Sequence, residues 1–409
     1  MLFNTKIMLK VLKEKQIIST VSLIRRRCTS APVRPYILGI ETSCDDSGAA
    51  IVSSNGHVLG ECIYSQQNSH LKFGGIIPPV AQDFHRMHID NVVQQTFQDA
   101  NMDCSQIDAI AVTNRPGLPL SLLVGLRYAK YLARKYQKPM IPIHHMEAHA
   151  LMARMTNKVT FPFICILISG GHSLLTLVKS TRQFYLLGET LDDAPGEAFD
   201  KIARRLKLRN LPDYAWLSGG RAIEQAAKFS NDTKKYDFPL PLSHYRDCQF
   251  SFAGLKNTAT RHILQQEKKL DLAPDAVIPD YPDLCAGFLN AAARHISQRT
   301  QRAIRFCEKE QLVQPNDARF LVVSGGVASN DTIFKTVANM AKTFGFETVR
   351  PKRQHCTDNG IMIAWNGIEK VLVEQDVTMD YASVDIVGKT KLGMSLIEKV
   401  KSANIPSKF

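Results

Sequence analysis

The hydrophobic and polar positions of the chain define short apolar runs that are separated by polar or glycine-containing turns. Their alternation predicts strands at Tyr36–Ile40, Ala49–Ser53 and His57–Ser65, which would form a β-meander. A loop rich in glycine and proline, HLKFGGIIPPVAQDFH, follows before the pattern becomes helical. The other elements expected in this half are a helix to about Ala100, a strand Ala109–Thr113, a helix Leu120–Tyr136 and a strand Met140–Ile143.

The same succession of elements then begins again. The run FPFICILISGGHSLLTLVKSTRQFYLLGET predicts three strands, and ARFLVVSGGVASNDTIFKTVANMAKTFG predicts a strand, a glycine turn and a helix. A β-meander followed by α/β units, occurring twice, indicates a duplicated two-lobed α/β fold that closes on a ligand in the cleft between its lobes. We expect an N-terminal lobe at 36–155, a C-terminal lobe at 156–375, a surface connection at Gln265–Asp283 and a peripheral tail at 376–409.

Net charge separates the first residues from the rest of the chain. The 409 residues carry a net charge of +13, while their hydrophobic fraction of 44% is ordinary for a soluble globular protein. Residues 1–35 hold eight Lys or Arg against one acid, so they supply seven of these thirteen charges. Such a leader is typical of a mitochondrial transit peptide, expected here at 1–34, although a disordered RNA-binding arm has a similar composition. The remainder is mildly basic, which is compatible with a nucleic-acid partner.

Two further patterns restrict the class of protein. The sequence contains no apolar run long enough to span a membrane, so no membrane insertion is expected. The nine cysteines are scattered and form no C-x-x-C pair. Their distribution argues against a disulfide framework or a cysteine zinc site, and it fits a reducing compartment.

Ser-Gly-Gly follows a strand-like run in each predicted lobe, in ILISGGHS and in LVVSGGVASN. Paired glycines let backbone N–H groups approach an anionic ligand, and a helix that starts after Asn330 adds partial positive charge. One such turn carries little information, because turns use glycine anyway. Two turns at equivalent places, together with Gly219-Gly220, predict a phosphate or nucleotide site.

Acidic side chains cluster in two other turns. GIETSCDDSG places Glu41, Asp45 and Asp46 after the first strand, where a two-lobed nucleotide-binding fold holds an acid for a metal or a water. A polar hairpin turn is the simpler alternative. In DDAPGEAFDK, Asp200 could accept hydrogen bonds from a sugar or an amino-acid group, whereas most acids of that motif are expected to be solvated or to cap a helix.

The motif HHMEAHA suggests a metal site but not a zinc protease. A zinc protease needs H-E-x-x-H, and here Met146 follows His145 while Glu147 comes one position late. His145 and His149 are four residues apart, which places both on one face of a helix. Two ligands are too few, and Asp358 in HCTDNGIMIAW is the best candidate for the third. The alternative is a pair of ordinary surface or core histidines.

Taken together, these motifs resemble a known family. GIETSCDDSG, HLKFGGIIPPVAQDFH, PGLPLSLLVG, HHMEAH, LISGGHSLL, DDAPGEAFDK, SGGVASN and CTDNGIMIAWNG occur in this order over 37–367. The set closely resembles the universal tRNA threonylcarbamoyl-adenosine transferase family, and its mitochondrial branch in particular. The resemblance implies the duplicated two-lobed actin-like ATPase (ASKHA) fold, with the active site in the inter-lobe cleft.

The resemblance also implies a group transfer to RNA. Members move the threonylcarbamoyl group from threonylcarbamoyl-AMP to N6 of the adenosine just 3′ of the anticodon, in tRNAs reading ANN codons, and release AMP. By position in the matching motifs, His145, His149 and Asp358 would bind one divalent metal ion per subunit, namely zinc, iron, manganese or magnesium. The matching substrate-binding residues are Leu167, Ile168, Ser169, Gly170, Gly171, Asp200, Gly220 and Asn330.

The chain departs from the family pattern just before Gly220. The spacer RNLPDYAWLS is longer than usual and Ser218 replaces the usual proline, so the conformation of that loop is in question. The adenine amine is a poor nucleophile, and Asp45 or Glu41 is the candidate general base. The candidate phosphate contacts are Lys72, Arg86, Arg204 and Arg205, each of which could equally be a solvated surface charge.

Two other functions would use parts of the same pattern. An actin-like small-molecule kinase would transfer the γ-phosphate of ATP and leave the paired histidines without a purpose. A non-haem iron oxygenase shares two histidines and one carboxylate, but such enzymes are usually small β-barrels. For the transferase, the resemblance implies a homodimer in the mitochondrial matrix. Its partners would be the tRNA anticodon stem-loop and a separate adenylate-forming enzyme that supplies threonylcarbamoyl-AMP.

Overall fold

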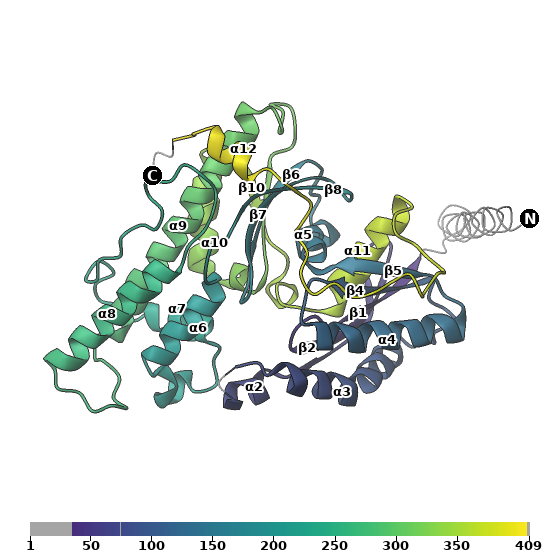
Figure 1. The fold of residues 1–409 in the computed structure, drawn as a ribbon, viewed down its shortest axis with the longest axis horizontal. Coiled ribbons are helices and arrows are strands. Elements are labelled where there is room, and N and C mark those ends of the chain that lie inside the picture. The colour runs from purple at the N-terminus through teal and green to yellow at the C-terminus, as the bar shows by residue number, and fades with distance from the viewer. Residues whose placement is uncertain (1–34, 74, 407–409) are drawn as a thin grey trace, which may run out of the picture. The chain divides into compact units, whose positions relative to one another are not determined.

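The chain folds into two compact units, which are described separately (Figure 1). The structure, a computed structural model, describes residues 35–73 and 75–406, without the side chains of residues 71 and 72. The expected transit peptide at 1–34 lies outside these residues. Unit 1 comprises the described residues up to Lys158 together with Asp358–Lys391, and unit 2 comprises Val159–Thr357 and the described residues from Leu392 onward. Within the described residues, every helix is too short or too polar to cross a membrane.

Unit 1 is built on a five-stranded sheet with the order β3-β2-β1-β4-β5. The first three strands are antiparallel neighbours, and β4 and β5 continue the sheet in parallel. This arrangement confirms the predicted meander followed by α/β units. The strands are β1 (Tyr36–Glu41), β2 (Asp46–Ser53), β3 (Val58–Ser65), β4 (Ala109–Arg115) and β5 (Met140–His144).

Helices cover both faces of this sheet because the strands are apolar on both sides. Leu38 and Ile40 pack toward Ile89 of α3 and Val124 of α4, and the alternate residue Ile37 faces α11. Figure 1 shows α3 and α4 lying together along one side of the strands. The helices of unit 1 are α2 (Gln67–Phe73), α3 (Pro78–Asp99), α4 (Pro119–Tyr136), α5 (His145–Thr156) and α11 (Gly360–Leu372).

The expected loop HLKFGGIIPPVAQDFH is mostly helical, which differs from the prediction. Helix α2 runs to Phe73, and α3 already begins at Pro78. A proline in the first turn of a helix removes an N–H that would have no helical partner, and its fixed φ suits the helix. Pro78 and Pro79 therefore start a helix here, rather than marking a long loop.

Unit 2 repeats the plan of unit 1 in a six-stranded sheet with the order β10-β9-β6-β7-β8-β11. β6, β7 and β8 are antiparallel neighbours, while β9 and β10 extend the sheet from β6 in parallel. The first five strands thus have the order and directions found in unit 1, which confirms the predicted duplication. The strands are β6 (Phe163–Ile168), β7 (Ser173–Ser180), β8 (Gln183–Glu189), β9 (Phe320–Ser324), β10 (Glu347–Val349) and β11 (Met394–Ser395).

The helices of unit 2 include one that the sequence pattern did not reveal. Helix α9 spans Tyr281–Lys309 and is buried on nearly all sides, although polar residues such as Arg299 and Arg302 are among its buried positions. Its buried Arg299 donates hydrogen bonds to the carbonyl oxygens of Tyr245 (3.0 Å) and Asp247 (3.1 Å) and so fixes the preceding loop. The other helices are α6 (Pro195–Arg205), α7 (Gly219–Ala227), α8 (Ala253–Lys269), α10 (Asp331–Lys342) and α12 (Ile397–Ser402).

The C-terminal region is more integrated than the predicted peripheral tail. Segment Asp358–Lys391 belongs to unit 1, although the expected C-terminal lobe extended to residue 375. The backbone N–H of Thr378 donates to Met140 O at 2.9 Å and the N–H of Met140 donates to Thr378 O at 2.8 Å, which adds a bridge beside β5. Farther along, β11 pairs with β8, and Val400 is fully buried in unit 2. Intermittent apolar residues are enough to anchor this segment, even though it lacks a regular period.

Candidate functional site

Helix α5 holds the two histidines of the H-x-x-x-H motif in unit 1. The helix begins directly after β5, and the His144 side chain caps it by accepting a hydrogen bond from the backbone N–H of Met146 at 3.2 Å. His145 and His149 are one helical turn apart, and their ring centroids lie 4.7 Å apart with perpendicular planes. Both imidazoles are buried, so the helix presents them together rather than to solvent.

The start of helix α11 brings Asp358 to the same place. Asn359 caps this helix, with its side-chain oxygen accepting from Met362 N at 2.9 Å. The helix lies with its backbone directly against the sheet: a Cβ placed on Gly39 would lie 2.3 Å from Ala364 N and from Gly360 O. Only glycine permits this approach, and the approach sets the position of Asp358 at the helix start.

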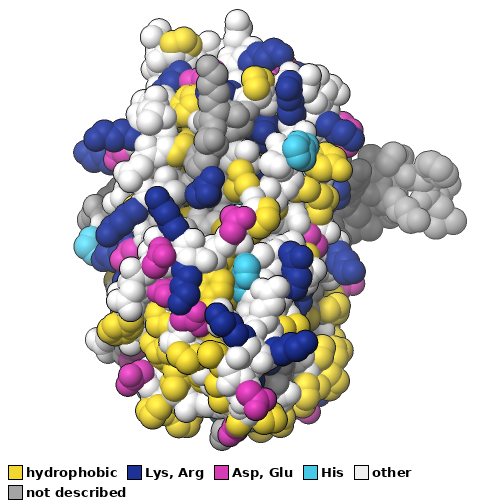
Figure 2. Space-filling model, turned by 90° about the vertical axis from the view of Figure 1, so that its left-hand side faces the viewer, with side chains coloured by type: hydrophobic (Ala, Val, Ile, Leu, Met, Phe, Trp, Pro, Cys, Tyr) yellow, Lys and Arg dark blue, Asp and Glu magenta, His cyan; other side chains and the backbone are white. Residues whose placement is uncertain are grey.

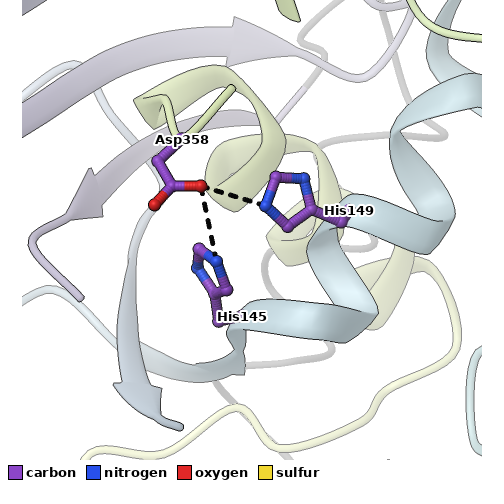
Figure 3. A group of neighbouring side chains, drawn as sticks. All are labelled: His145, His149 and Asp358. Atoms are coloured by element: carbon purple, nitrogen blue, oxygen red, sulfur yellow. Dashed lines mark hydrogen bonds and ion pairs between the residues drawn. The ribbon is translucent and has the colours of Figure 1, made fainter. Parts of the chain in front are cut away.

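His145, His149 and Asp358 converge on one point within unit 1 (Figure 3). Asp358 Oδ1 lies 3.1 Å from His149 Nε2 and 3.5 Å from His145 Nε2. One ligand atom from each residue lies within 4.8 Å of the others. Two imidazole nitrogens and one carboxylate oxygen form a donor set that divalent transition metals accept, with positions left for other ligands.

A second carboxylate lies behind His145. Glu41 Oε2 is 3.2 Å from His145 Nδ1, on the side of the ring opposite Asp358. Glu41 is fully buried, and it accepts hydrogen bonds of 2.5 Å from Thr113 Oγ1 and from Ser43 N. A carboxylate on the far nitrogen of an imidazole fixes its tautomer, so that Nε2 faces the metal position.

The charges around His145 favour a cation at this place. Burial opposes protonation of His145, but Asp358 and Glu41 outweigh it and raise its pKa to about 9. Burial likewise opposes ionisation of Glu41, and the neighbouring His145 reverses this, so the pKa of Glu41 is lowered. The two carboxylates that favour a positive charge on His145 would therefore also favour a divalent ion.

The remaining residues of GIETSCDDSG lie nearby in the turn between β1 and β2. Burial raises the pKa of Asp45, and burial together with the Asp45 charge raises that of Asp46 to about 7. Among the described residues, Asp46 Oδ1 is buried without a hydrogen-bond partner. Burial also raises the pKa of the Cys44 thiol well above its usual range, so this thiol is a poor source of thiolate.

Glu147 lies away from the three candidate ligands, as its position in the motif predicts. Its Oε2 is 3.4 Å from Nζ of Lys370, a buried residue of α11 that also lies 2.8 Å from Asp376. A zinc protease would need this carboxylate beside the metal as its general base. Here it belongs to an ion-pair cluster that ties α5 to α11.

Unit 2 contains the residues that the resemblance implies for substrate binding. Leu167 and Ile168 end β6 and are fully buried, and the turn Ser169–Gly171 follows them. Ser169 Oγ accepts hydrogen bonds from Gly171 N (3.3 Å) and His172 N (3.1 Å), so these two N–H groups already have an acceptor within the turn. The sequence had suggested that such amides point at the ligand. The turn itself is open, since a Cβ on Gly171 would meet nothing within 4 Å.

Asp200 and the Gly219-Gly220 pair lie together in spite of the long spacer between them. Asp200 accepts backbone hydrogen bonds from Gly219 and Gly220, and burial raises its pKa. A Cβ on Gly219 would lie 2.4 Å from Asp200 Oδ1, so this contact requires glycine. Asn330 is a buried N-cap of α10, and its side-chain oxygen accepts from Ile333 N at 3.0 Å. The spacer thus keeps the pair beside Asp200, while the Asn330 oxygen has a structural partner.

The four candidate phosphate contacts have different surroundings. Arg205 forms an ion pair with Glu267 at 2.5 Å, and Arg86 lies 3.4 Å from Asp83, whereas Arg204 is exposed. The side chain of Lys72 lies outside the described part of the chain. Figure 2 shows one face of the molecule, on which Lys and Arg side chains are interspersed with acidic and hydrophobic ones. Basic side chains are therefore distributed over this face rather than gathered in one stripe.

Sequence reasoning missed Ser43 and Thr113, the two hydroxyl residues around Glu41. Ser43 Oγ lies 3.1 Å from His145 Nδ1, and Thr113 donates to Glu41 from the end of β4. The signal that could have found Thr113 is its place at the end of a predicted parallel strand, where polar groups of neighbouring strands meet. Ser43 lies in the acidic motif itself, between Glu41 and Asp45, and its serine gave no signal beyond that of a polar turn.

Comparisons with known proteins agree with these features. The sequence profile of the tRNA N6-adenosine threonylcarbamoyltransferase family matches residues 57–365. A probable mitochondrial tRNA N6-adenosine threonylcarbamoyltransferase of Drosophila melanogaster is 49% identical over 94% of this chain and 94% of its own length. The mitochondrial tRNA N6-adenosine threonylcarbamoyltransferase of Homo sapiens is 45% identical over 90% of this chain and 89% of its own.

Solved structures show the same fold at low sequence identity. HypF from T. kodakarensis superposes with a TM-score of 0.51 and 12% identity, covering 83% of this chain and 48% of that one. At this identity the likeness concerns the fold alone. Together with the duplicated sheets, it confirms the predicted α/β fold of the actin-like ATPase (ASKHA) class.

Proposed function

The chain belongs to the tRNA N6-adenosine threonylcarbamoyltransferase family, and from this premise we propose that it transfers a threonylcarbamoyl group to N6 of adenosine in tRNA. The donor is threonylcarbamoyl-AMP, and the acceptor is the adenosine just 3′ of the anticodon in mitochondrial tRNAs reading ANN codons. The reaction takes place in the mitochondrial matrix. The observation that carries the proposal is the 49% identity to a mitochondrial relative over 94% of the chain.

The residues of unit 1 fit a divalent metal ion. His145 Nε2, His149 Nε2 and Asp358 Oδ1 would be its ligands, and Glu41 supports His145 from behind. Imidazole and carboxylate donors suit zinc, iron or manganese better than magnesium, which prefers oxygen ligands. When bound, the ion would supply a Lewis acid that stabilises negative charge on the transferring or departing oxygens.

The proposed reaction needs no covalent enzyme intermediate, because the mixed carbamic–phosphoric anhydride is already activated. The adenine N6 forms a bond to the carbamoyl carbon, the carbon–oxygen bond to the phosphate breaks, and AMP leaves with the electron pair. The proton of N6 passes to a base. The raised pKa of Cys44 supports this route, since a protonated thiol is a poor nucleophile.

We infer that Asp45, rather than Glu41, receives that proton. Both oxygens of Glu41 already accept short hydrogen bonds, and the side chain is fully buried. A base must reach the reacting amine within hydrogen-bond distance. Asp45 lies at the turn between two strands and keeps part of its surface exposed, so it is the better placed of the two candidates.

The residues of unit 2 would hold the adenylate. The open turn Ser169–Gly171 has room beside both glycines, and Asp200 is fixed by the N–H groups at the start of α7. A carboxylate with a fixed orientation can accept a hydrogen bond from a hydroxyl or an ammonium group of the ligand. These residues orient the donor, while its chemistry takes place at the carbamoyl carbon.

The proposal is tested by incubating the purified protein with tRNA and threonylcarbamoyl-AMP and analysing the nucleosides by mass spectrometry. The expected result is threonylcarbamoyl-adenosine at the position next to the anticodon, and a strong loss after the metal has been stripped. His145→Ala and His149→Ala are expected to lose metal binding and transfer while they stay folded. Absence of product, or ADP formation from ATP with a small hydroxyl or carboxyl substrate, would contradict the transferase assignment.

A further inference from the structure

The loop before α7 carries an unusually exposed tryptophan. Trp216 is 84% exposed, the highest value among the large hydrophobic side chains that the structure describes. Removing an indole from water is favourable, so one left in solvent is a candidate contact for a binding partner. The chain has only two tryptophans, and the other one, Trp365, is 8% exposed in α11.

The backbone on both sides of Trp216 is anchored to unit 2. Tyr214 is buried, and its ring packs edge-to-face against Tyr281 with centroids 5.9 Å apart. Leu217 packs against the same core, and its N–H donates to Tyr214 O at 3.1 Å. The indole is therefore presented from a fixed turn. A partner that contacts it would lose little conformational entropy in ordering the loop.

The same loop adjoins the residues that are proposed to hold the donor. Helix α7 begins at Gly219, three residues after Trp216, and the Gly219 N–H donates to Asp200 of α6. The start of α6 packs onto the substrate turn, since a Cβ on Gly196 would lie 2.9 Å from Ser169 O. The loop of Trp216 is thus linked to the turn Ser169–Gly171 by two contacts, one between Gly219 and Asp200 and one between Gly196 and Ser169.

Three exposed arginines lie near the loop, which also carries one exposed acid, Asp213. Arg204 and Arg209 are exposed, and both act electrostatically on Asp200. Arg221 is exposed in the first turn of α7. Single-stranded RNA is bound by this combination, in which unpaired bases stack on aromatic rings and arginines contact the phosphates. A protein partner would instead need a wider apolar patch, whereas the other exposed side chains of this loop are mostly polar or charged: Arg209, Asn210, Pro212 and Asp213.

We propose that the Trp216 indole is a stacking platform for an unpaired base of the tRNA anticodon loop, with the flanking arginines holding the adjacent phosphates. The inference rests on the proposed function, because it takes tRNA as the partner. It assigns a role to the long spacer that distinguishes this chain from the family pattern. The platform binds RNA and takes no part in the transfer step.

Tryptophan fluorescence gives a direct test. In a Trp365→Phe variant, Trp216 is the sole tryptophan, and the replacement is mild because Trp365 Nε1 has no hydrogen-bond partner among the described residues. The anticodon stem-loop is expected to quench the emission and to protect Trp216 from acrylamide. A blunt RNA duplex of similar length, which hides its base faces, is expected to do neither when bound.

Substitution of Trp216 gives an independent test. Base–aromatic stacking corresponds to roughly a 5- to 100-fold change in affinity, so Trp216→Ala should raise the Kd for the stem-loop by that factor. Trp216→Phe should lose less, because a phenyl ring still stacks. Phe229→Ala is the matched control, since Phe229 is 64% exposed beyond the other end of α7 and should leave the Kd within about two-fold.

Transfer kinetics separate the platform from the proposed function. Trp216→Ala is expected to raise KM for tRNA and to keep kcat at saturating tRNA, because the indole binds RNA without acting on the reacting atoms. If RNA binds while Trp216 stays accessible to acrylamide, or if Trp216→Ala binds RNA as well as the parent, the platform is refuted and the transferase stands. A parent protein that forms no threonylcarbamoyl-adenosine refutes the proposed function instead.

Discussion

At the scale of single residues, Glu41 is the candidate whose assignment the structure changes most. The sequence offers it as a possible general base because it lies in an acidic turn. In the fold it is fully buried, and its oxygens are held by Thr113, Ser43 and His145. A side chain in such surroundings orients the imidazole rather than the substrate. Glu41 is therefore better described as a positioning residue for the candidate ligand His145.

Removal of Glu41 is expected to weaken metal binding. Glu41→Ala should lower the affinity for Zn²⁺ by about 10- to 100-fold, because His145 loses the group that fixes its tautomer and ring orientation. Glu41→Gln should lose less, since the amide oxygen can still accept from Nδ1–H. The measurement is competition with a coloured zinc chelator, and circular dichroism confirms that the variants stay folded.

The exposed Glu61 of β3 provides the control for this experiment, as Glu61→Gln removes a carboxylate from the same unit away from the three ligands. Its zinc affinity should match that of the parent protein. Equal affinity of Glu41→Ala and the parent would show that His145 needs no support from Glu41.

The candidate ligands could be predicted from the sequence only in part. His145 and His149 follow from helical periodicity, which relates residues one turn apart. Asp358 is 209 positions from His149, so no local pattern connects them. It was proposed because a third ligand was needed and it is an acid at a predicted helix start, and the resemblance to a family supported that choice. Thr113 was missed because no local pattern connects it with Glu41 either. Its contact with Glu41 depends on the pairing of β1 with β4, which brings together residues 72 positions apart.

At the scale of elements, the placement of α11 depends on glycine. Gly39 of β1 allows the backbone of the helix to lie directly on the strand, and this contact fixes the helix start that carries Asp358. A side chain at position 39 cannot be accommodated by a rotamer change, because the opposing atoms belong to the backbone. The strand and the candidate metal site are therefore coupled through one residue without a side chain.

Gly39→Ala is expected to destabilise the protein by about 1–3 kcal/mol or more, since the added methyl group must displace the helix. The same displacement should weaken zinc binding by moving Asp358. Gly254→Ala in the first turn of α8 is the matched control, because a Cβ there meets nothing within 4 Å. The control is expected to unfold in urea at the same concentration as the parent protein or slightly above it. Equal midpoints for all three proteins would contradict the close packing.

The prediction of elements succeeded where short strands alternate with turns, and it failed where burial is complete. The strands β1 to β9 lie at or near the predicted runs, because each has a period of two or a continuous apolar core, whereas the short strands β10 and β11 were not predicted. Helix α9 was missed because its buried positions include arginines such as Arg299 and Arg302, which read as a polar surface in the sequence. Their carbonyl partners come from loops that no local pattern identifies.

An ion pair between α6 and α8 makes stability depend on acidity. The hydrogen bond from Arg205 is the largest influence on Glu267, and Lys207 acts in the same direction. Together they outweigh burial and lower the pKa of Glu267 to about 2 from an ordinary value of 4.5. A carboxyl group whose pKa is lower in the folded than in the unfolded protein stabilises the fold at any pH above its unfolded pKa. This stabilisation is lost as the pH falls from the unfolded pKa to the folded pKa. The acid-sensitive window of this pair is therefore about pH 4.5 to 2.

Glu267→Gln is expected to lower the free energy of unfolding by roughly 1–3 kcal/mol at neutral pH, the usual worth of hydrogen bonds to charged groups. The difference from the parent protein should shrink as the pH falls below about 4.5. Glu197→Gln, which removes an exposed partner of Lys201 on α6, should change stability by less than about 0.5 kcal/mol. Urea unfolding at several pH values measures both, and a pH-independent difference would assign the loss to packing.

At the scale of the whole molecule, we expect two copies of the chain to associate. This expectation follows from the resemblance to the mitochondrial branch of the family, whose members are expected to act as homodimers without obligatory accessory subunits. Size-exclusion chromatography with light scattering should give about twice the mass of one chain. A monomeric mass at micromolar concentration, together with full transfer activity, would show that the reaction needs only one copy.

The path of the chain through the three ligands has a consequence for its biosynthesis. The histidines belong to a helix that ends at Thr156, and the whole of 159–357 is synthesised before the acid that completes the trio. On the ribosome, the nascent polypeptide therefore holds two of the three candidate ligands while its second sheet is being made. A product that terminates early keeps the two imidazoles but lacks the carboxylate, so, if these residues hold an ion as proposed, tight retention of it would mark a polypeptide translated at least as far as Asp358.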